Sequence, residues 1–163
     1  MNIIEELQKE LKSEYQITKK FLEKYPESKN DWKPHEKSMS MKTLVVHVIE
    51  IFAWPEIIMN TDFLDFAETP YTQPEIRTLT GLQQKLEDDY RKGAQTLKNL
   101  TPEKLDGKWD IRKGEIVFQE WSKYGAIRHS FQQITHHRAQ LGVYYRLNDI
   151  FVPGSYGPSA DER

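Results

Sequence analysis

The chain has 163 residues, a formal net charge of −2 at pH 7 and no cysteine. This length suits one domain around one core, so we expect a single domain over residues 1–163. The lack of cysteine excludes disulfides, thiolate zinc sites and cysteine nucleophiles, and the lack of a basic stripe argues against nucleic-acid binding.

The first residues and the apolar runs of the chain predict a cytoplasmic protein. Residues 1–6 lack the basic and apolar regions of a secretory signal peptide. No uninterrupted apolar run approaches the 18 residues that a membrane-spanning helix requires. We therefore expect neither a membrane nor a nucleic acid among the partners.

Apolar side chains recur at helical spacing in four segments, and each segment is predicted to form one amphipathic helix. The predicted helices cover residues 2–24, 41–60, 80–100 and 120–147. Because each has one apolar stripe to bury, the four together predict an all-α fold, a four-helix bundle.

Local signals indicate where two of these helices begin or bend. Ser38 or Ser40 can accept hydrogen bonds from the free amides at the start of the second helix. Pro55 is expected to kink or shorten that helix, because proline lacks the amide hydrogen. Thr80 and Gln83 have the spacing of a capping box, which predicts the start of the third helix.

Two connections between the predicted helices differ in character. Residues 61–79 form a long polar connection with Pro70 and Pro74, and a connection of this length often covers a site. Its acidic residues, such as Asp65, are expected to lie in a solvated loop. Residues 108–118 alternate between apolar and polar around a Lys-Gly pair, which predicts a short β-hairpin before the last helix.

The candidate chemistry lies on two of the predicted helices. Gln133 and His137 are four residues apart, so steps of about 100° per residue place both on the inward face of the last helix. His47 faces inward on the second helix, at a similar depth if the two helices are antiparallel. Imidazoles on facing helices can build a metal site in a bundle, but Gln133 and His137 could equally be a buried hydrogen-bonded pair.

Neighbouring polar residues fit this site less well. His129 also leans inward, but eight residues separate it from His137, about 12 Å along the helix axis, so the two cannot bind one ion. His136 points about 100° away, toward solvent or a neighbouring subunit. Arg138 and Gln140 are equally well explained as ordinary polar positions of a helix.

Four segments of the chain together resemble the DinB/YfiT-like family of small four-helix metalloproteins. The segments are Trp32-Lys33-Pro34 with the following residues 37–41, Leu44-Val45-Val46-His47, His136-His137-Arg138-Ala139-Gln140-Leu141, and residues 152–162. The third segment is the most specific. The segments occur in the family's order over most of the chain, which supports the bundle prediction.

The resemblance implies a metal, often zinc or nickel, held by three histidines. One ligand comes from the position of His47, and two come from a pair at the positions of Gln133 and His137. This chain departs from the family at Gln133, because glutamine offers only a neutral carbonyl oxygen to a zinc-like ion. We therefore expect a divalent metal to be bound weakly or not at all.

Two functional hypotheses follow. The first is a DinB-like metal-dependent enzyme of unknown substrate, either a small-molecule thiol transferase or a hydrolase, as the resemblance implies. The second is a metal-free DinB-like bundle that binds a small molecule or acts through a dimer interface. The presence of His47 and His137 favours the first hypothesis, and Gln133 favours the second.

The ring content of the chain predicts a homodimer. Aromatic residues make up 12% of the sequence, which is more ring surface than a small core requires. Related bundles also often pair. The candidate interface residues are Trp54, Tyr124 and Tyr145.

Overall fold

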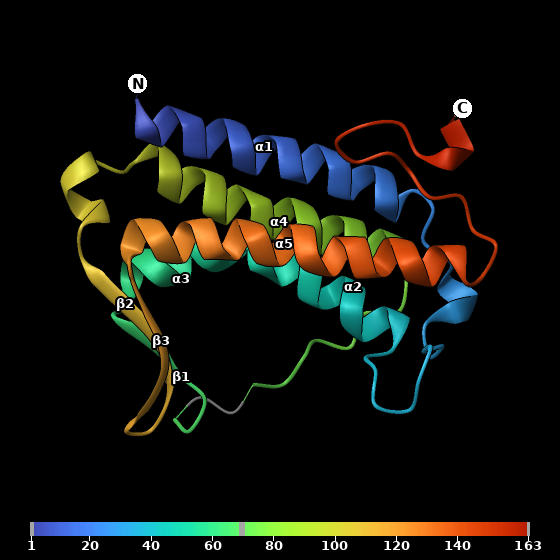
Figure 1. The fold of residues 1–163 in the computed structure, drawn as a ribbon, viewed down its shortest axis with the longest axis horizontal. Coiled ribbons are helices and arrows are strands. Elements are labelled where there is room, and N and C mark those ends of the chain that lie inside the picture. The colour runs from blue at the N-terminus through green and yellow to red at the C-terminus, as the bar shows by residue number, and fades with distance from the viewer. Residues whose placement is uncertain (1, 69–70, 163) are drawn as a thin grey trace.

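Four helical segments lie side by side in the computed structural model, which describes residues 2–68 and 71–162 (Figure 1). The α-helices are α1 (Ile3–Leu22), α2 (Met41–Glu50), α3 (Trp54–Asn60), α4 (Leu79–Lys98) and α5 (Lys123–Arg146). Short 3₁₀ turns are η1 (Glu27–Lys29), η2 (Ile51–Ala53), η3 (Pro102–Leu105) and η4 (Ala160–Glu162). Since α2, η2 and α3 form one continuous segment, the predicted four-helix bundle is confirmed.

The second helical segment is broken where its sequence predicts. The turn η2 interrupts the α-helical pattern. Pro55 lies in the first turn of α3, where backbone amides have no partner within the helix, so proline costs no helical hydrogen bond there. Ser40 rather than Ser38 caps α2, because the Ser40 hydroxyl accepts from the backbone nitrogen of Thr43 at 3.2 Å.

Two helices start at other residues than predicted, α4 one residue earlier and α5 three residues later. The helix α4 begins after Thr78, whose backbone is extended and whose hydroxyl accepts from Gly81 N, so Thr80 lies inside the helix and does not cap it. The helix α5 begins at Lys123 and not at residue 120, because Ser122 is its N-cap and the residues before it belong to a strand.

The segment Met41–Asn60 is long and apolar enough by composition to cross a membrane, with a mean hydropathy of 1.3. This segment contains no long uninterrupted apolar run, because residues such as Lys42, His47 and Glu50 interrupt it, so the sequence pattern did not indicate it. A core helix passes the same test, and this segment supplies much of the core. Its fully buried side chains are Met41, Val45, Val46, Val48, Ile49, Ile51, Phe52 and Ile58.

A small three-stranded sheet extends from one end of the bundle (Figure 1). Its strands are β1 (Phe63–Asp65), β2 (Lys108–Lys113) and β3 (Ile116–Ser122), in the order β1-β2-β3. The strands β2 and β3 form the predicted hairpin, and Gly114 at its turn has a φ of 60°, which glycine adopts without strain. The helices and this hairpin agree with the predicted fold class.

The strand β1 was not predicted, because it lies in the connection that was expected to be a loop. It pairs parallel with β2, and Asp65 at its end is buried rather than solvated. The Asp65 carboxylate accepts from the backbone nitrogens of Ala67 at 2.7 Å and Gly114 at 3.0 Å. These bonds lower the pKa of Asp65 and attach the connection to the hairpin turn. Pro70, in the same connection, lies outside the described residues.

One ion pair lies in the core between α1 and α5. The Arg138 side chain is 1% exposed, and its Nη2 lies 2.6 Å from Glu14 Oε2. Arg138 Nη1 also donates to the backbone oxygen of Glu14 and to the hydroxyl of Thr18, each at 3.2 Å. The Tyr156 hydroxyl donates to Glu14 Oε1 at 2.8 Å, so the C-terminal tail is attached to the same pair. Arg138 is therefore a buried link between helices and not an ordinary surface position.

Tyr145 is also a core residue. It is fully buried, and its hydroxyl donates to the backbone oxygen of Phe21 at 2.8 Å. The prediction that Tyr145 contributes to a dimer interface was therefore wrong, because the ring is already covered within one protomer.

The close approach of α4 to η2 leads to a stability prediction. A Cβ atom at Gly93 would lie 2.2 Å from the backbone oxygen of Phe52 and 3.3 Å from Leu11 Cδ2. We expect Gly93→Ala to lower the free energy of unfolding by about 1–3 kcal/mol despite the higher helix propensity of alanine, because backbone must move. Chemical denaturation measures the change.

Gly107→Ala is the matched control, because its Cβ would meet only the flexible side chain of Lys123, no closer than 3.4 Å. This control should change the stability by less than about 0.5 kcal/mol. A Gly93→Ala protein as stable as the parent would contradict the close packing of α4 on η2.

Candidate metal centre

The structure brings His47, Gln133 and His137 together where α2 packs against α5. The ring centroids of His47 and His137 are 4.5 Å apart, with their planes at 77°. Gln133 Oε1 lies 3.1 Å from His137 Nε2. All three side chains are partly exposed, so the cluster lies at the edge of the core and not in its centre.

The direction of His137 follows from its neighbour on α5. Arg138 points into the core toward α1, where it meets Glu14. Because successive residues of a helix are rotated by about 100°, His137 is turned away from α1 and faces α2. Gln133, one helical turn earlier, shares this face, as the residue spacing predicted.

The hydrogen bonds of His137 indicate which ring nitrogen carries its proton. Gln140 Oε1 lies 3.2 Å from His137 Nδ1, and Gln140 Nε2 lies 3.0 Å from His136 Nε2. In this arrangement the Gln140 amide donates to His136 and accepts from His137. Since a neutral imidazole has only one N–H, His137 Nδ1 is the donor and its Nε2 has a lone pair.

With the Gln133 amide in this orientation, His137 Nε2 and Gln133 Oε1 point two lone pairs at the same space. Two atoms bound to one zinc-like ion at 2.0–2.2 Å, at angles between 90° and tetrahedral, are separated by about 2.9–3.5 Å. The observed 3.1 Å fits that geometry. It equally fits a rotated Gln133 amide that donates its N–H to His137, which is the hydrogen-bonded pair without metal.

Burial keeps both imidazoles in the form that binds metal. It lowers the pKa of His47 from 6.5 to about 4, with a smaller contribution from nearby His137. Burial also lowers the pKa of His137. Both rings are therefore neutral at pH 7, and a neutral imidazole is the metal ligand.

The set of ligands is incomplete by the usual chemistry of such sites. Among residues 2–68 and 71–162, no three His, Cys, Asp or Glu side chains are grouped so that they could hold a metal ion. His136 is exposed, as predicted, and His129 packs on the ring of Trp121 with centroids 4.5 Å apart. The candidate centre therefore consists of two imidazoles and one amide, with solvent able to complete it.

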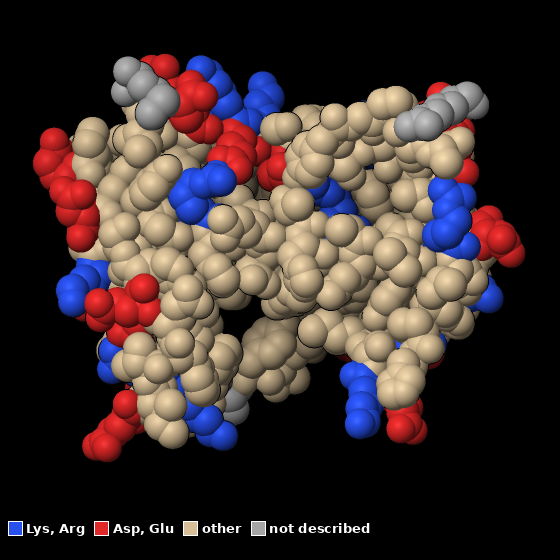
Figure 2. Space-filling view, viewed as in Figure 1, with Lys and Arg blue, Asp and Glu red and all other residues tan. Residues whose placement is uncertain are grey.

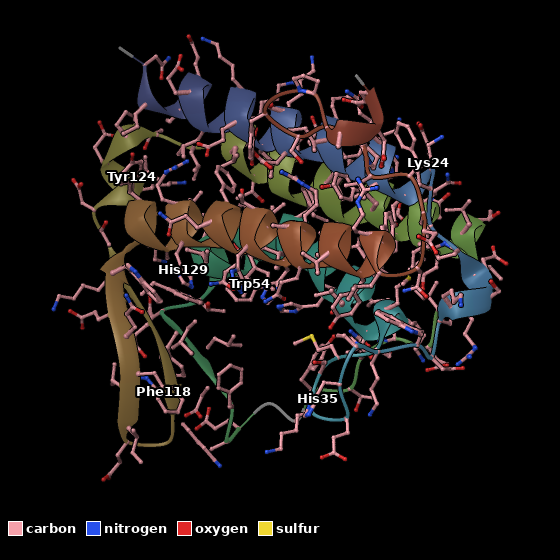
Figure 3. The ribbon with its side chains drawn as sticks, turned by 45° about the vertical axis from the view of Figure 1, so that its right-hand side comes forward. Lys24, His35, Trp54, Phe118, Tyr124 and His129 are labelled. Atoms are coloured by element: carbon pink, nitrogen blue, oxygen red, sulfur yellow. The ribbon has the colours of Figure 1, made fainter. Side chains whose placement is uncertain are left out.

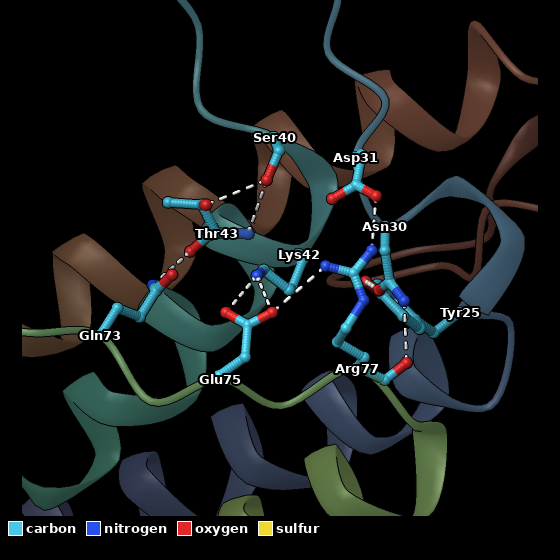
Figure 4. Close-up of polar contacts among 9 residues, drawn as sticks. All are labelled: Tyr25, Asn30, Asp31, Ser40, Lys42, Thr43, Gln73, Glu75 and Arg77. Carbon is cyan, nitrogen blue, oxygen red and sulfur yellow. Dashed lines mark hydrogen bonds and ion pairs between the residues drawn. The ribbon is translucent and has the colours of Figure 1, made fainter.

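The surface is hollowed below α5, between the sheet and the loop over residues 31–40 (Figure 2). Residues 71–78, which lead into α4, run below α2 (Figure 1). Several of them are fastened to α2 and to residues 30–31 (Figure 4). The contacts are Gln73 Nε2 to Thr43 O at 2.8 Å, Lys42 Nζ to Glu75 Oε2 at 2.6 Å, Arg77 Nη2 to Asp31 Oδ2 at 2.5 Å and Asn30 Nδ2 to Arg77 O at 2.8 Å. These contacts hold residues 73–77 against α2 and against residues 30–31.

Comparisons with known proteins agree with this architecture. The sequence model of the DinB family matches residues 1–162. The crystal structure of a DinB-like protein, YjoA from Bacillus subtilis, matches with a TM-score of 0.69 and 19% sequence identity, over 97% of this chain and 99% of that chain. At this identity the match shows a shared fold alone. No curated protein matches the chain.

The low pKa of His47 predicts a loss of stability in acid. Between pH 6.5 and about 4, the unfolded chain binds a proton at His47 that the folded chain does not, so stability falls as the pH falls. Allowing for the partial exposure of the ring, we expect this residue to cost about 1 kcal/mol between pH 7 and pH 5. His47→Asn should remove that part of the decline.

Urea denaturation of the parent and the variant at pH 7 and pH 5 measures this effect. His136→Asn on the exposed neighbour is the control and should leave the decline unchanged. If His47→Asn and His136→Asn lost stability equally between the two pH values, His47 would not be held neutral by burial.

Proposed function

The chain belongs to the DinB family, and from this premise we propose that it is a metal-dependent enzyme that acts on a small molecule at His47, Gln133 and His137. The main support is the convergence of His137 Nε2 and Gln133 Oε1, 3.1 Å apart, beside the neutral ring of His47. A thiol transferase or a hydrolase is the proposed reaction class, with the substrate entering from the hollow below α5.

His47 and His137 would hold the ion, and Gln133 would offer a weak third ligand through its carbonyl oxygen. A bound zinc or nickel ion supplies Lewis acidity, which polarises a substrate or lowers the pKa of a bound water or thiol. Gln140 keeps His137 in place because its Oε1 accepts a hydrogen bond from His137 Nδ1–H, so Nε2 remains directed at the centre.

A second candidate function is a metal-free bundle that binds a small molecule. It is supported by the other orientation of the Gln133 amide, in which the N–H donates to His137 Nε2 and no ion is needed. The two functions differ in one measurable property, which is the affinity of the purified protein for zinc.

Gln133→His tests the metal proposal. The substitution places two imidazoles four residues apart on one face of α5, opposite His47, which restores a three-histidine site. We expect zinc affinity, measured by calorimetric titration of untagged protein, to rise at least tenfold. Added zinc should also raise the thermal midpoint of this variant more than that of the parent.

His137→Ala in each background is the control, and it should abolish the zinc binding of both proteins. Unchanged affinity in Gln133→His would show that the three side chains do not converge. Zinc binding that survives His137→Ala would place the site elsewhere. A parent protein that binds no zinc, beside a Gln133→His variant that binds it tightly, would favour the metal-free function.

We also propose that the protein is a cytoplasmic homodimer without nucleic-acid or membrane partners. The outer face of α5 exposes Val143 and Leu147, which are 56% and 60% exposed and one helical turn apart. Tyr124, on the same helix, is 37% exposed. Trp54 is partly buried against the core. Exposed apolar side chains at the C-terminal end of α5 suit a symmetric pairing of two copies.

Light scattering tests the dimer. We expect the mass of two chains at micromolar concentration, and a shift toward the monomer in Leu147→Glu, because a charge would be buried at the interface. Ile116→Glu, at an equally exposed position of the sheet, is the control and should remain dimeric. A parent protein with the mass of one chain at high micromolar concentration would contradict the proposal.

A further inference from the structure

The two faces of the small sheet differ in chemistry. Along β2, alternate residues point to opposite faces. Trp109 and Ile111 share the inner face with their partners Trp121 on β3 and Leu64 on β1. Trp109 is fully buried, whereas Leu64, Ile111 and Trp121 pack on the core with part of each side chain exposed.

The outer face of the sheet carries two ion pairs. Lys108 pairs with Glu120 at 3.0 Å, and Arg112 pairs with Asp110. The inner-face residues Leu64, Ile111 and Trp121 have no ionisable group. Close to the bundle the inner face is therefore apolar, whereas toward the hairpin turn Gln119, the partner of Ile111, and Lys113 share this face.

Two helices continue the apolar surface. Trp54 of α3 lies 6.5 Å from Trp109 between ring centroids, and His129 of α5 lies 4.5 Å from Trp121. Figure 3 labels both Trp54 and His129 below α5. Burial lowers the pKa of His129, so this ring also adds no charge at pH 7.

We call this surface the aromatic wall. Its residues are Trp54, Leu64, Ile111, Trp121 and His129. It leads directly to the candidate metal centre, because His129, Gln133 and His137 follow each other at four-residue spacing on α5. From His129, Gln133 is about 6 Å and His137 about 12 Å along the helix axis. A small molecule of that length would reach from the wall to His137.

We propose that the aromatic wall is a binding site for an uncharged, planar apolar group of a small molecule. Indole and imidazole faces bind such a group by stacking, and a charged group would lose its hydration without gaining an ion pair. This proposal rests on the proposed function in one respect only, which is that the reacting end of the molecule would lie at His137. Stacking itself requires no metal.

N-Phenyl-1-naphthylamine is a neutral, planar probe whose fluorescence rises in apolar surroundings. We expect saturable binding to the metal-free protein in the presence of a chelator. Ile111→Glu should weaken this binding at least tenfold, because it places a charge in the aromatic wall. Val117→Glu is the matched control on the outer face, where Val117 is 49% exposed, and it should leave the affinity unchanged.

A nitrogen-15 NMR titration of the unsubstituted protein tests the same proposal without requiring that the variants fold. The chain has four tryptophans, so the indole N–H signals in a nitrogen-15 spectrum report on separate regions. The probe should shift the signals of Trp54 and Trp121. It should leave unchanged the signal of Trp32, which packs on Tyr144 with ring centroids 5.3 Å apart.

Absence of saturable binding would overturn the proposal. So would an equal loss of affinity in Ile111→Glu and Val117→Glu, or probe shifts at Trp32 without shifts at Trp54 and Trp121. Because the probe titration contains no metal, failure of zinc binding would leave this result intact. Failure of probe binding would likewise leave the metal proposal standing.

Discussion

The buried ion pair between Arg138 and Glu14 sets the rotation of α5 about its own axis. Separating these partners would leave a charge inside the core, at a cost of about 3–5 kcal/mol. The helix is therefore restrained to the orientation in which Arg138 meets α1. His137, the preceding residue, then faces α2 and His47, and Gln133 and His129 follow on the same side. One contact on the far side of α5 thus directs the candidate site.

Burial and charge act together along that side of α5. Partial burial lowers the pKa of both histidines of the candidate centre, which favours the neutral imidazoles that can bind a cation. The aromatic wall beside them is uncharged for a different reason, since the sheet places its ion pairs on the outer face. Under the two proposals, a polar end and an apolar end of one small-molecule site would follow each other along α5.

Local patterns in the sequence were sufficient for the features that depend on near neighbours. Apolar spacing predicted the helices, period-two alternation predicted the hairpin, and helical geometry placed Gln133 with His137. Features that depend on distant partners were missed. The strand β1 pairs with β2, which lies far along the chain. Glu14 lies 124 positions from Arg138, so the residues next to either one in the sequence do not indicate the ion pair. Thr78 and Thr80 offer similar capping groups, and only the backbone conformation distinguishes them.

The central claim is that His47, Gln133 and His137 converge on one point that is open to solvent. Crystals soaked in millimolar zinc, measured at the zinc absorption edge, test this claim even if the affinity is low. We expect an anomalous peak within bonding distance of the His137 Nε2 and Gln133 Oε1 atoms and of a ring nitrogen of His47. Crystals with zinc only at other positions, or with no zinc at these three side chains, would contradict it.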